Sequence, residues 1–515
     1  MNDLPALELL QITKRYGALA ANHNATVRIK RGSIHAIVGE NGAGKSTLLK
    51  IAYGSVRADS GRIVIRGKDI ERDHHAPRQA ILQGLGMVHQ HFMLVPTLTA
   101  LENAALGVEG GFLLDLAPTR RAVAELGESL CLGVDPDRLV SELSIGEQQR
   151  VEILKTLLRG ADTLLLDEPT AVLSPPEVKD LLRVMRALAE KGKTVILVSH
   201  RLDEVQAIAD RITVMRRGEV VAEFDQGVTS QVIARAMVGR DLVPVRREPG
   251  HEERTTEILL EVKDLSVSGR GGTNAVRRVS FSVRAGEIFG IAGVQGNGQS
   301  ELVLALAGLI PQRSGAVHLG GEEITRATPR RRMELGMAHV PGDRHKRGLL
   351  LDASLLENLI LGRQHEFSSG WRMDKGKMAA FAAARLTELD IRPAHPETLA
   401  GALSGGNQQK VVLARELSRS GLRVLICAEP TRGVDVGATE VIHRQLLTAR
   451  DRGVAVVLVS SELSELRALS DRLGVMFRGE LCAVLPPGVD DDTLGAFMTG
   501  ARVKGASEAA EGGST

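Results

Sequence analysis

The chain has 515 residues, 43% hydrophobic and 25% charged, so it is long enough for several hydrophobic cores and has the composition of an ordinary globular protein. Its net charge of +2, the lack of a dense basic block and an aromatic content of 2% argue against a nucleic-acid partner. Its apolar runs fall far short of the roughly 18 residues that span a bilayer, so any role at a membrane is expected to depend on partners.

The first element with chemical meaning is a predicted phosphate-binding loop. Apolar residues 34–38 predict a strand before it, and residues 48–52 predict a helix after it. Between them the chain matches G-x-x-x-x-G-K-[ST], and the alternative is an ordinary glycine-rich turn. Such a loop turns backbone N–H groups towards phosphate oxygens, while Lys45 adds a cation and Ser46 a hydroxyl ligand for Mg²⁺. The predicted nucleotide contacts are Gly39, Glu40, Asn41, Gly42, Ala43, Gly44, Lys45, Ser46 and Thr47.

Residues 93–160 carry helical periodicity without strand signals, and they predict a helical subdomain inserted into the fold. Just before it, Gln90 follows an apolar pair and is a candidate bridge between Mg²⁺ and this subdomain, although a single glutamine is a weak signal. The apolar side chains within residues 92–102 have two interpretations. They belong to the core of the subdomain, or they form a docking surface for a partner.

Two acidic residues follow the next predicted strand. Residues 164–166 and 194–198 are short apolar runs, and helical stretches such as 177–191 alternate with them, so a parallel α/β sheet is expected. Asp167 and Glu168 then lie at the carboxyl edge of that sheet, where ligands of such folds bind. Asp167 is suited to hold Mg²⁺ and Glu168 to polarise an attacking water, whereas an acidic pair on the surface would have no such role.

His200 follows the strand at residues 194–198. A lone histidine at a strand end is more often structural than catalytic. Its position beside a phosphate loop nevertheless favours a contact with the terminal phosphate of a nucleotide.

The chain contains a duplicated domain. Residues 31–39 recur as 285–293, and residues 143–150 recur as 403–410. A polar run rich in proline, glycine and charge separates the copies, and the end of the chain is rich in glycine, alanine, serine and glutamate. The predicted division is a first domain at 6–240, a linker at 241–257, a second domain at 258–499 and a disordered tail at 500–515.

The second copy lacks catalytic side chains at the corresponding positions. Gln299 stands at the lysine position, Ala428 at the Mg²⁺ aspartate and Ser461 at the histidine, although Glu429 is retained. A neutral amide cannot compensate phosphate charge as an ammonium does. The predicted remnants of this second nucleotide site are Gly293, Gly296, Gly298, Gln299, Ser300 and Glu429.

Taken in order, these residues resemble the nucleotide-binding domains of ATP-binding cassette (ABC) transporters. Phosphate loop, Q-loop, signature, acidic strand end, D-loop and switch histidine follow one another, and the resemblance covers both copies. It implies an α/β fold of two tandem P-loop ABC-type ATPase domains, each with a RecA-like core and an inserted helical subdomain. It also implies ATP and Mg²⁺ as cofactors, with Tyr16 stacked on adenine and the metal held by Ser46, Gln90 and Asp167.

The resemblance further implies that the two halves pair head to tail, so that each site takes its signature and D-loop from the opposite half. The second site would receive Ser144 and Gly146 from a signature in which Ile145 replaces a glycine, and Ser174 stands at the D-loop acid. The first site would be completed by Ser404, Gly405, Gly406, Asn407 and Asp435.

Under this pairing, the side chains that are missing from the second loop and from the first signature all belong to one composite site. The other site is complete, with Lys45, Glu168 and His200 as its catalytic residues. One site is therefore expected to hydrolyse ATP, and the second to hold nucleotide without turnover or only to pair the halves.

A duplicated ATPase without membrane spans resembles the subunit that energises bacterial sugar and nucleoside importers. Residues 89–96 and 145–150 are similar to the nucleoside-type branch, and residues 343–348 support this placement less specifically. The resemblance implies two integral-membrane permeases, an extracytoplasmic solute-binding protein and a peripheral location on the cytoplasmic face of the inner membrane. The alternatives are an importer of simple sugars, a soluble twin-cassette ATPase acting on ribosomes or nucleic acid, and a regulatory nucleotide sensor.

Overall fold

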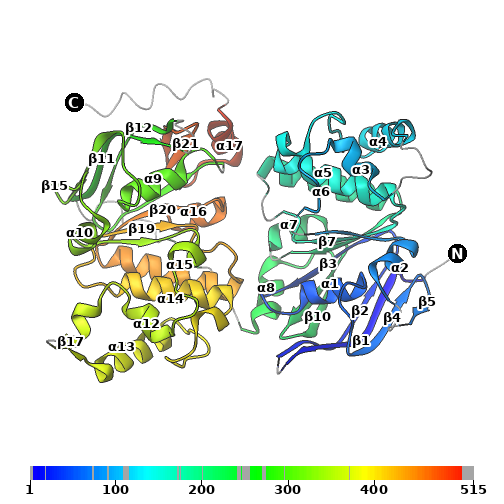
Figure 1. The fold of residues 1–515 in the computed structure, drawn as a ribbon, viewed down its shortest axis with the longest axis horizontal. Coiled ribbons are helices and arrows are strands. Elements are labelled where there is room, and N and C mark those ends of the chain that lie inside the picture. Colours follow the sequence, from blue (N-terminus) through cyan, green and yellow to red (C-terminus); the bar gives the residue numbers. More distant parts are fainter. Residues whose placement is uncertain are drawn as a thin grey trace. The chain divides into compact units, whose positions relative to one another are not determined.

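The computed structural model describes residues 4–17, 19–71, 75–89, 92–107, 115–170, 173, 175–199, 201–240, 245, 247, 256–269, 274–294, 296–369 and 372–500. The chain divides into two compact units, Met1–Leu242 and Val243–Thr515 (Figure 1). Most of the predicted linker and nearly all of the predicted tail lie outside the described residues, so those boundaries stay predictions.

A six-stranded sheet in the order β10-β9-β3-β8-β7-β6 forms the centre of the first unit. All neighbouring strands in it are parallel except β10, which pairs antiparallel with β9. Its strands are β3 (Ile34–Gly39), β6 (Leu85–Val88), β7 (Thr163–Asp167), β8 (Thr194–Val198), β9 (Arg211–Arg216) and β10 (Glu219–Asp225). Leu165 packs into one hydrophobic cluster while Leu164 and Leu166 pack into another, so both faces of the sheet are covered. This two-sided burial explains the continuous apolar runs and confirms the predicted parallel α/β sheet.

A second, antiparallel sheet in the order β2-β1-β4-β5 was not predicted. Its long strands are interrupted by register shifts, and Gln11 and Asn24 within them have positive φ angles. Such irregularities break the alternation of apolar and polar residues by which a strand is predicted. The strands are β1 (Leu7–Tyr16), β2 (Leu19–Ile29), β4 (Ser60–Ile65) and β5 (Lys68–Ile70).

The helices of the first unit cover the sheet and form the predicted subdomain. They are α1 (Lys45–Ala52), α2 (Pro77–Leu82), α3 (Ala100–Ala105), α4 (Ala117–Ser129), α5 (Ile145–Leu158), α6 (Pro175–Glu190), α7 (Leu202–Ile208) and α8 (Ser230–Val238), with a short 3₁₀ helix at Val140–Glu142. Helices α3, α4 and α5 gather on the far side of the six-stranded sheet from β1 and β2 (Figure 1). The described part of residues 93–160 forms no strand, which agrees with the predicted helical subdomain.

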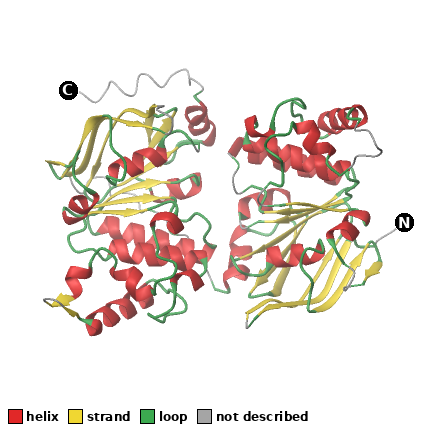
Figure 2. Ribbon diagram, viewed as in Figure 1, coloured by secondary structure: helices red, strands yellow, loops and turns green. Residues whose placement is uncertain are grey.

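The second unit repeats this plan, with a six-stranded sheet β16-β19-β20-β13-β21-β22 and an antiparallel sheet β12-β11-β14-β15 (Figure 2). The strands are β11 (Ile258–Ser268), β12 (Asn274–Arg284), β13 (Ile288–Ala292), β14 (Ser314–Leu319), β15 (Glu322–Glu323), β16 (Met337–Val340), β17 (Ser368–Ser369), β18 (Arg372–Met373), β19 (Val424–Ala428), β20 (Ala455–Val459), β21 (Arg472–Phe477) and β22 (Glu480–Leu485). The helices are α9 (Gln299–Leu306), α10 (Pro329–Glu334), α11 (Arg344–Arg347), α12 (Leu355–Ile360), α13 (Lys375–Glu388), α14 (Gly405–Leu417), α15 (Val436–Asp451), α16 (Leu463–Leu469) and α17 (Asp491–Thr499), with 3₁₀ helices at Gln364–Phe367 and Ala400–Ala402.

Across the part of the chain that is described, none of the helices combines the length and the apolar character that a membrane span requires.

Candidate functional site

The phosphate loop joins β3 to α1, and glycines determine its shape. A side-chain carbon on Gly39 would lie 2.3 Å from the carbonyl oxygen of Met215. Gly44 caps α1 at a φ of 96°, and a side-chain carbon there would lie 2.1 Å from the carbonyl oxygen of Ala21. Gly42 has a φ of 82° with open space around it. Close packing therefore requires glycine at position 39, the left-handed backbone favours it at position 42, and both reasons apply at position 44.

Lys45 begins α1 and folds back over the loop. Its ammonium donates to the carbonyl oxygens of Gly39 at 2.8 Å and of Glu40 at 2.9 Å, and the residue is only 5% exposed. The cation is thus held at the loop, where phosphate oxygens would be stronger acceptors than these carbonyls.

The fold brings Ser46 against Asp167, the last residue of β7. The Ser46 hydroxyl donates a 2.9 Å hydrogen bond to Oδ1 of Asp167. Burial raises the pKa of the Asp167 carboxyl, the nearby Glu168 charge raises it further, and the Ser46 hydrogen bond opposes both. A hydroxyl beside a carboxylate offers the hard oxygen ligands that Mg²⁺ prefers.

No group of three or more histidine, cysteine or acidic side chains suited to a metal occurs among the described residues. The Ser46 hydroxyl and the Asp167 carboxylate would supply two oxygen ligands to a Mg²⁺ ion, which commonly binds to one or two protein groups together with phosphate oxygens and water. The pair fits such an ion.

Glu168 lies directly beyond the carboxyl edge of the sheet, in a strained backbone conformation. Its φ is 49°, and its N–H donates to the carbonyl oxygen of Val198 on the neighbouring strand at 3.0 Å. Glu429 repeats this arrangement, with a φ of 47° and a 2.7 Å bond to Val459. A left-handed non-glycine residue costs about 1–3 kcal/mol, and such residues cluster at functional sites.

Several predicted site residues cannot be placed, and one lies at the surface. Gln90, His200 and Ser174 lie outside the described residues. Tyr16, at the end of β1, is 51% exposed, and the Lys14 ammonium lies 5.5 Å from the centre of its ring. The ring is accessible to a flat ligand, and its stacking role stays a prediction.

The second phosphate loop keeps the backbone of the first but not its lysine. Gly296 and Gly298 have φ angles of 95° and 97°. The Gln299 amide donates to the carbonyl oxygen of Val294 at 3.2 Å. The residues predicted from the repeat, Gly293, Gly296, Gly298, Gln299 and Ser300, all lie at the turn from β13 into α9.

The acidic end of β19 also differs from that of β7. Ala428 ends the strand, so no carboxylate occupies the position of Asp167. Glu429 is retained and accepts a 2.9 Å hydrogen bond from the Ser461 hydroxyl, and burial raises the pKa of its carboxyl. The second half therefore has the fold of a phosphate site without its cation or its metal carboxylate.

The two signature segments begin corresponding helices. Ser144 caps α5, and Ser404 caps α14. Asp435 caps α15, and a side-chain carbon on Gly406 would lie 2.9 Å from its Oδ2. The fold thus brings the second signature, Ser404, Gly405, Gly406 and Asn407, together with the D-loop acid of the same unit.

Buried polar residues that support the site were missed in the sequence. The Asn22 amide donates to the carbonyl oxygen of Gly44 at 3.1 Å, which attaches the phosphate loop to β2. The Lys155 ammonium donates to the carbonyl oxygen of Met93 at 2.7 Å, which attaches the loop after β6 to α5. The only sequence signal for either is a polar residue within an apolar pattern, which is not specific.

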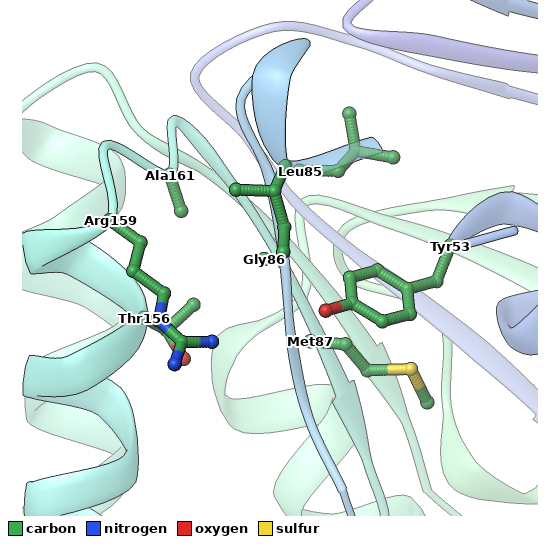
Figure 3. A pocket seen from close by; sticks show the side chains of 8 residues that line it. Tyr53, Leu85, Gly86, Met87, Thr156, Arg159 and Ala161 are labelled. Carbon is green, nitrogen blue, oxygen red and sulfur yellow. The ribbon is translucent and has the colours of Figure 1, made fainter. Parts of the chain in front are cut away.

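A small pocket lies near the C-terminal end of α1, away from the phosphate loop (Figure 3). Tyr53 and Arg159 point towards it from either side of β6, and the Arg159 guanidinium donates to the carbonyl oxygen of Leu106. Its lining consists of Tyr53, Ile81, Leu85, Gly86, Met87, Thr156, Arg159 and Ala161. The pocket contains none of the predicted site residues.

The chain is similar to known proteins along nearly its whole length. The family model described as ABC transporter matches residues 22–171 and 276–432. The nucleoside import ATP-binding protein NupA of Lactococcus lactis subsp. cremoris (strain MG1363) is 43% identical over 509 residues, which cover 98% of this chain and 100% of NupA. The ribose import ATP-binding protein RbsA of Shouchella clausii (strain KSM-K16) is 38% identical over 501 residues, 96% of this chain and 98% of RbsA.

One solved structure matches most of the chain. The crystal structure of archaeal ribosome recycling factor aABCE1 in complex with ribosomal stalk protein aP1 matches with a TM-score of 0.62. The match covers 92% of this chain and 89% of that one at 22% identity, so it shows a shared fold alone.

Proposed function

Because the chain belongs to the ABC transporter family and carries two ATP-binding cassettes in tandem, we propose that it is the ATP-hydrolysing subunit of a nucleoside importer. The observation that carries this proposal is the juxtaposition of Lys45, Ser46 and Asp167 at the first phosphate loop, in a chain of which 98% aligns with a nucleoside import ATP-binding protein. The two permeases, the extracytoplasmic binding protein and the cytoplasmic membrane face belong to the same proposal.

The first phosphate loop binds the triphosphate of ATP. Backbone N–H groups of residues 39–47 and the Lys45 ammonium hold its β- and γ-phosphates, and Tyr16 stacks on the base. Ser46, Asp167 and Gln90 would hold Mg²⁺, which would supply positive charge beside the phosphates when bound.

Glu168 orients and polarises the water that attacks the γ-phosphate, and His200 contacts that phosphate. The position of Glu168 beyond the carboxyl edge of β7 places its carboxylate beside Asp167, where a water in line with the transferred phosphate is expected.

The working site is completed by the second half. In the proposed head-to-tail pairing, Ser404, Gly406 and Asp435 face the terminal phosphate held by the first loop. The pattern of losses supports this pairing. The signature and D-loop of the first half, which would complete the incomplete second loop, also lack the usual residues. Closure of the halves on ATP and reopening after hydrolysis then drives the permeases.

The second site does not turn over ATP. Gln299, Ala428 and Ser461 replace its cation, metal carboxylate and histidine. Removal of one transition-state charge partner commonly slows phosphoryl transfer by roughly 10³–10⁵. With three losses in one site, hydrolysis there is negligible.

The permease docks on the segment that follows β6. Met93 is 64% exposed and Val95 40% exposed, whereas Leu101 is 2% exposed, so residues 92–102 divide between surface and core. Asn103 fixes the exposed part, since it accepts from the N–H of Val95 at 2.8 Å and donates to its carbonyl oxygen at 3.0 Å. A rigid apolar surface of this kind suits a partner helix.

The test is solute uptake by the reconstituted system. The chain is co-expressed with candidate permease pairs, and uptake of labelled guanosine, uridine, ribose and glucose is measured. We expect nucleoside uptake that disappears with Glu168→Gln. Uptake of ribose or glucose alone would favour the sugar alternative, and co-purification with ribosomes in place of permeases would overturn the importer.

A further inference from the structure

Three segments of the second unit meet at one arginine side chain. Arg344 begins α11, the short helix after β16, and its side chain is partly buried. Its guanidinium donates to Oε1 of Gln408 at 3.2 Å and to the carbonyl oxygen of Arg432 at 3.0 Å. Gln408 belongs to the signature helix α14, and Arg432 belongs to the D-loop between β19 and α15. One side chain therefore links the segment after β16 to both the signature helix and the D-loop.

The guanidinium packs tightly against the first residue of the signature helix. A side-chain carbon on Gly405 would lie 2.6 Å from Nη2 of Arg344 and 2.9 Å from the carbonyl oxygen of Gly433. Gly433 follows Arg432 in the D-loop, and its φ is 66°. The guanidinium thus lies beside both the N-terminus of α14 and the D-loop backbone, and no residue larger than glycine fits at position 405 without displacing one of them.

Further hydrogen bonds hold α11 on the signature helix. A ring nitrogen of His345 lies 2.9 Å from Oε1 of Gln408, the atom that also accepts from Arg344. At the other end of α11, Arg415 of α14 donates to the carbonyl oxygen of Gly348 at 2.8 Å. Helix α11 is therefore attached to α14 at both ends, so the position of the signature helix depends on the segment after β16.

The repeat explains only one of these attachments. Lys155 of α5 stands at the repeat position of Arg415, and it donates to the segment after β6 as Arg415 donates to the segment after β16. The segment between β6 and α3 is shorter than its counterpart, its described residues form no helix, and no arginine occurs in residues 89–98. The repeat therefore provides no counterpart for Arg344.

We propose that Arg344 is a positioning residue for ATP hydrolysis, which fixes the second signature and the D-loop relative to each other. This inference rests on the proposed head-to-tail pairing, in which Ser404, Gly406 and Asp435 complete the working site. Because the N–H groups of a guanidinium are coplanar and rigid, one arginine holds two acceptors at a fixed separation. Without this side chain the signature and the D-loop can shift apart, and a displacement of about 1 Å in groups that position a substrate can slow a reaction by about 100-fold.

The first experiment measures steady-state ATPase activity of the full chain, with thermal melting to check folding. Arg344→Ala is compared with Arg344→Lys, which keeps the charge but not the rigid fork, and with Arg347→Ala at an exposed position of the same helix. We expect Arg344→Ala to lower kcat about tenfold or more, and Arg344→Lys at least about threefold. The KM for ATP should stay within about twofold, because the first phosphate loop is intact, and Arg347→Ala should change neither constant.

An unchanged kcat in Arg344→Ala would overturn the inference, and so would an equal loss in Arg347→Ala. If Arg344→Ala does not fold, Arg344→Lys takes its place, and an unchanged kcat in that variant would overturn the inference. If the unmodified chain hydrolyses no ATP, the proposed function fails instead.

The second experiment separates positioning of the signature from a general effect on the fold. The variant of Arg344 is combined with Ser404→Ala, and kcat of the double variant is compared with kcat of each single variant. If Arg344 acts by placing the signature, the two losses overlap, so kcat of the double variant should stay within about threefold of the slower single variant. Losses that multiply in the double variant would overturn the inference.

Discussion

The fold disfavours ionisation of Asp167, the carboxylate that is proposed to hold the metal of the first site. Burial, assisted by the neighbouring Glu168, raises the pKa of Asp167 above that of an unfolded aspartate. The native state therefore binds more protons than the unfolded state between the two values, and its stability falls as the pH rises through that window. Mg²⁺ binding needs the ionised form, so function and stability oppose each other at this residue.

Asp167→Asn is expected to stabilise the protein while it abolishes Mg²⁺-dependent turnover. The amide keeps Oδ1 as an acceptor for Ser46 and removes a buried charge. A gain of about 1 kcal/mol would raise Tm by roughly 2–4 °C at pH 8. The gain should shrink as the pH falls and vanish below about pH 3, where the carboxyl is protonated in both states. Thermal melting against pH is the measurement, with the exposed Asp225→Asn as control; a lower Tm for Asp167→Asn at pH 8 would contradict this account.

The proposed site residues could be located from the sequence because motifs of fixed spacing specify Lys45, Ser46, Asp167 and their degenerate counterparts locally. Their supports were not predictable, since Asn22 contacts the loop from a strand that precedes it and Glu177 contacts the signature across a helix pair.

At the scale of elements, the loop between β3 and α1 contains glycines that are required for two different reasons, close packing and a left-handed backbone. Gly44→Ala must place a methyl group 2.1 Å from a backbone oxygen, whereas Gly42→Ala meets only an unfavourable φ. A left-handed alanine costs about 1–2 kcal/mol, so Gly42→Ala should lower Tm by roughly 2–8 °C. Gly44→Ala should lower it by more than roughly 10 °C or prevent folding. Thermal melting of the two variants decides, and similar Tm values would contradict the packing argument.

We predict that the segment after β6 couples ATP hydrolysis to the permeases and takes no part in the hydrolysis itself. Met93→Glu places a charge on the exposed apolar surface and should abolish capture of the permeases, with basal ATPase activity of the isolated chain retained. Leu82→Glu is the matched control, because Leu82 is 70% exposed on α2 and outside the proposed docking surface. Co-purification in detergent measures capture. Equal loss with both variants, or with neither, would exclude this surface as the docking site.

Some helices and strands were predicted from the sequence and others were missed, and the difference has a physical reason. Strands β3, β7 and β8 are buried on both faces and give short apolar runs, and α5 and α6 carry helical periodicity. The antiparallel strands β1 and β2 contain bulges that shift the side-chain alternation, so no simple period describes them.

At the scale of the whole molecule, the duplicated chain is asymmetric in its chemistry and symmetric in its fold. Both units have the same order of strands, left-handed glutamates at the same sheet edge and serine-capped signature helices. Only the first has a lysine and a metal carboxylate. The first half would thus supply the chemistry, and the second half the signature that completes it.

Matched variants of the two serine N-caps test this division of roles between the two halves. Ser404→Ala and Ser144→Ala each remove an N-cap, at a similar cost of about 1 kcal/mol. If Ser404 also contacts the γ-phosphate, its loss should lower kcat by roughly 10–100-fold, whereas Ser144→Ala should leave kcat within about twofold. Steady-state ATPase assays at saturating ATP measure both. A larger effect of Ser144→Ala would contradict the pairing.

The most direct measurement compares the two glutamates that follow corresponding strands, because they share a left-handed backbone conformation and belong to different proposed sites. ATPase activity of the full chain is measured for Glu168→Gln and Glu429→Gln. We predict that Glu168→Gln lowers turnover by roughly 100-fold or more, while Glu429→Gln retains at least about half of it. Equal and complete loss in both variants would contradict a single working site.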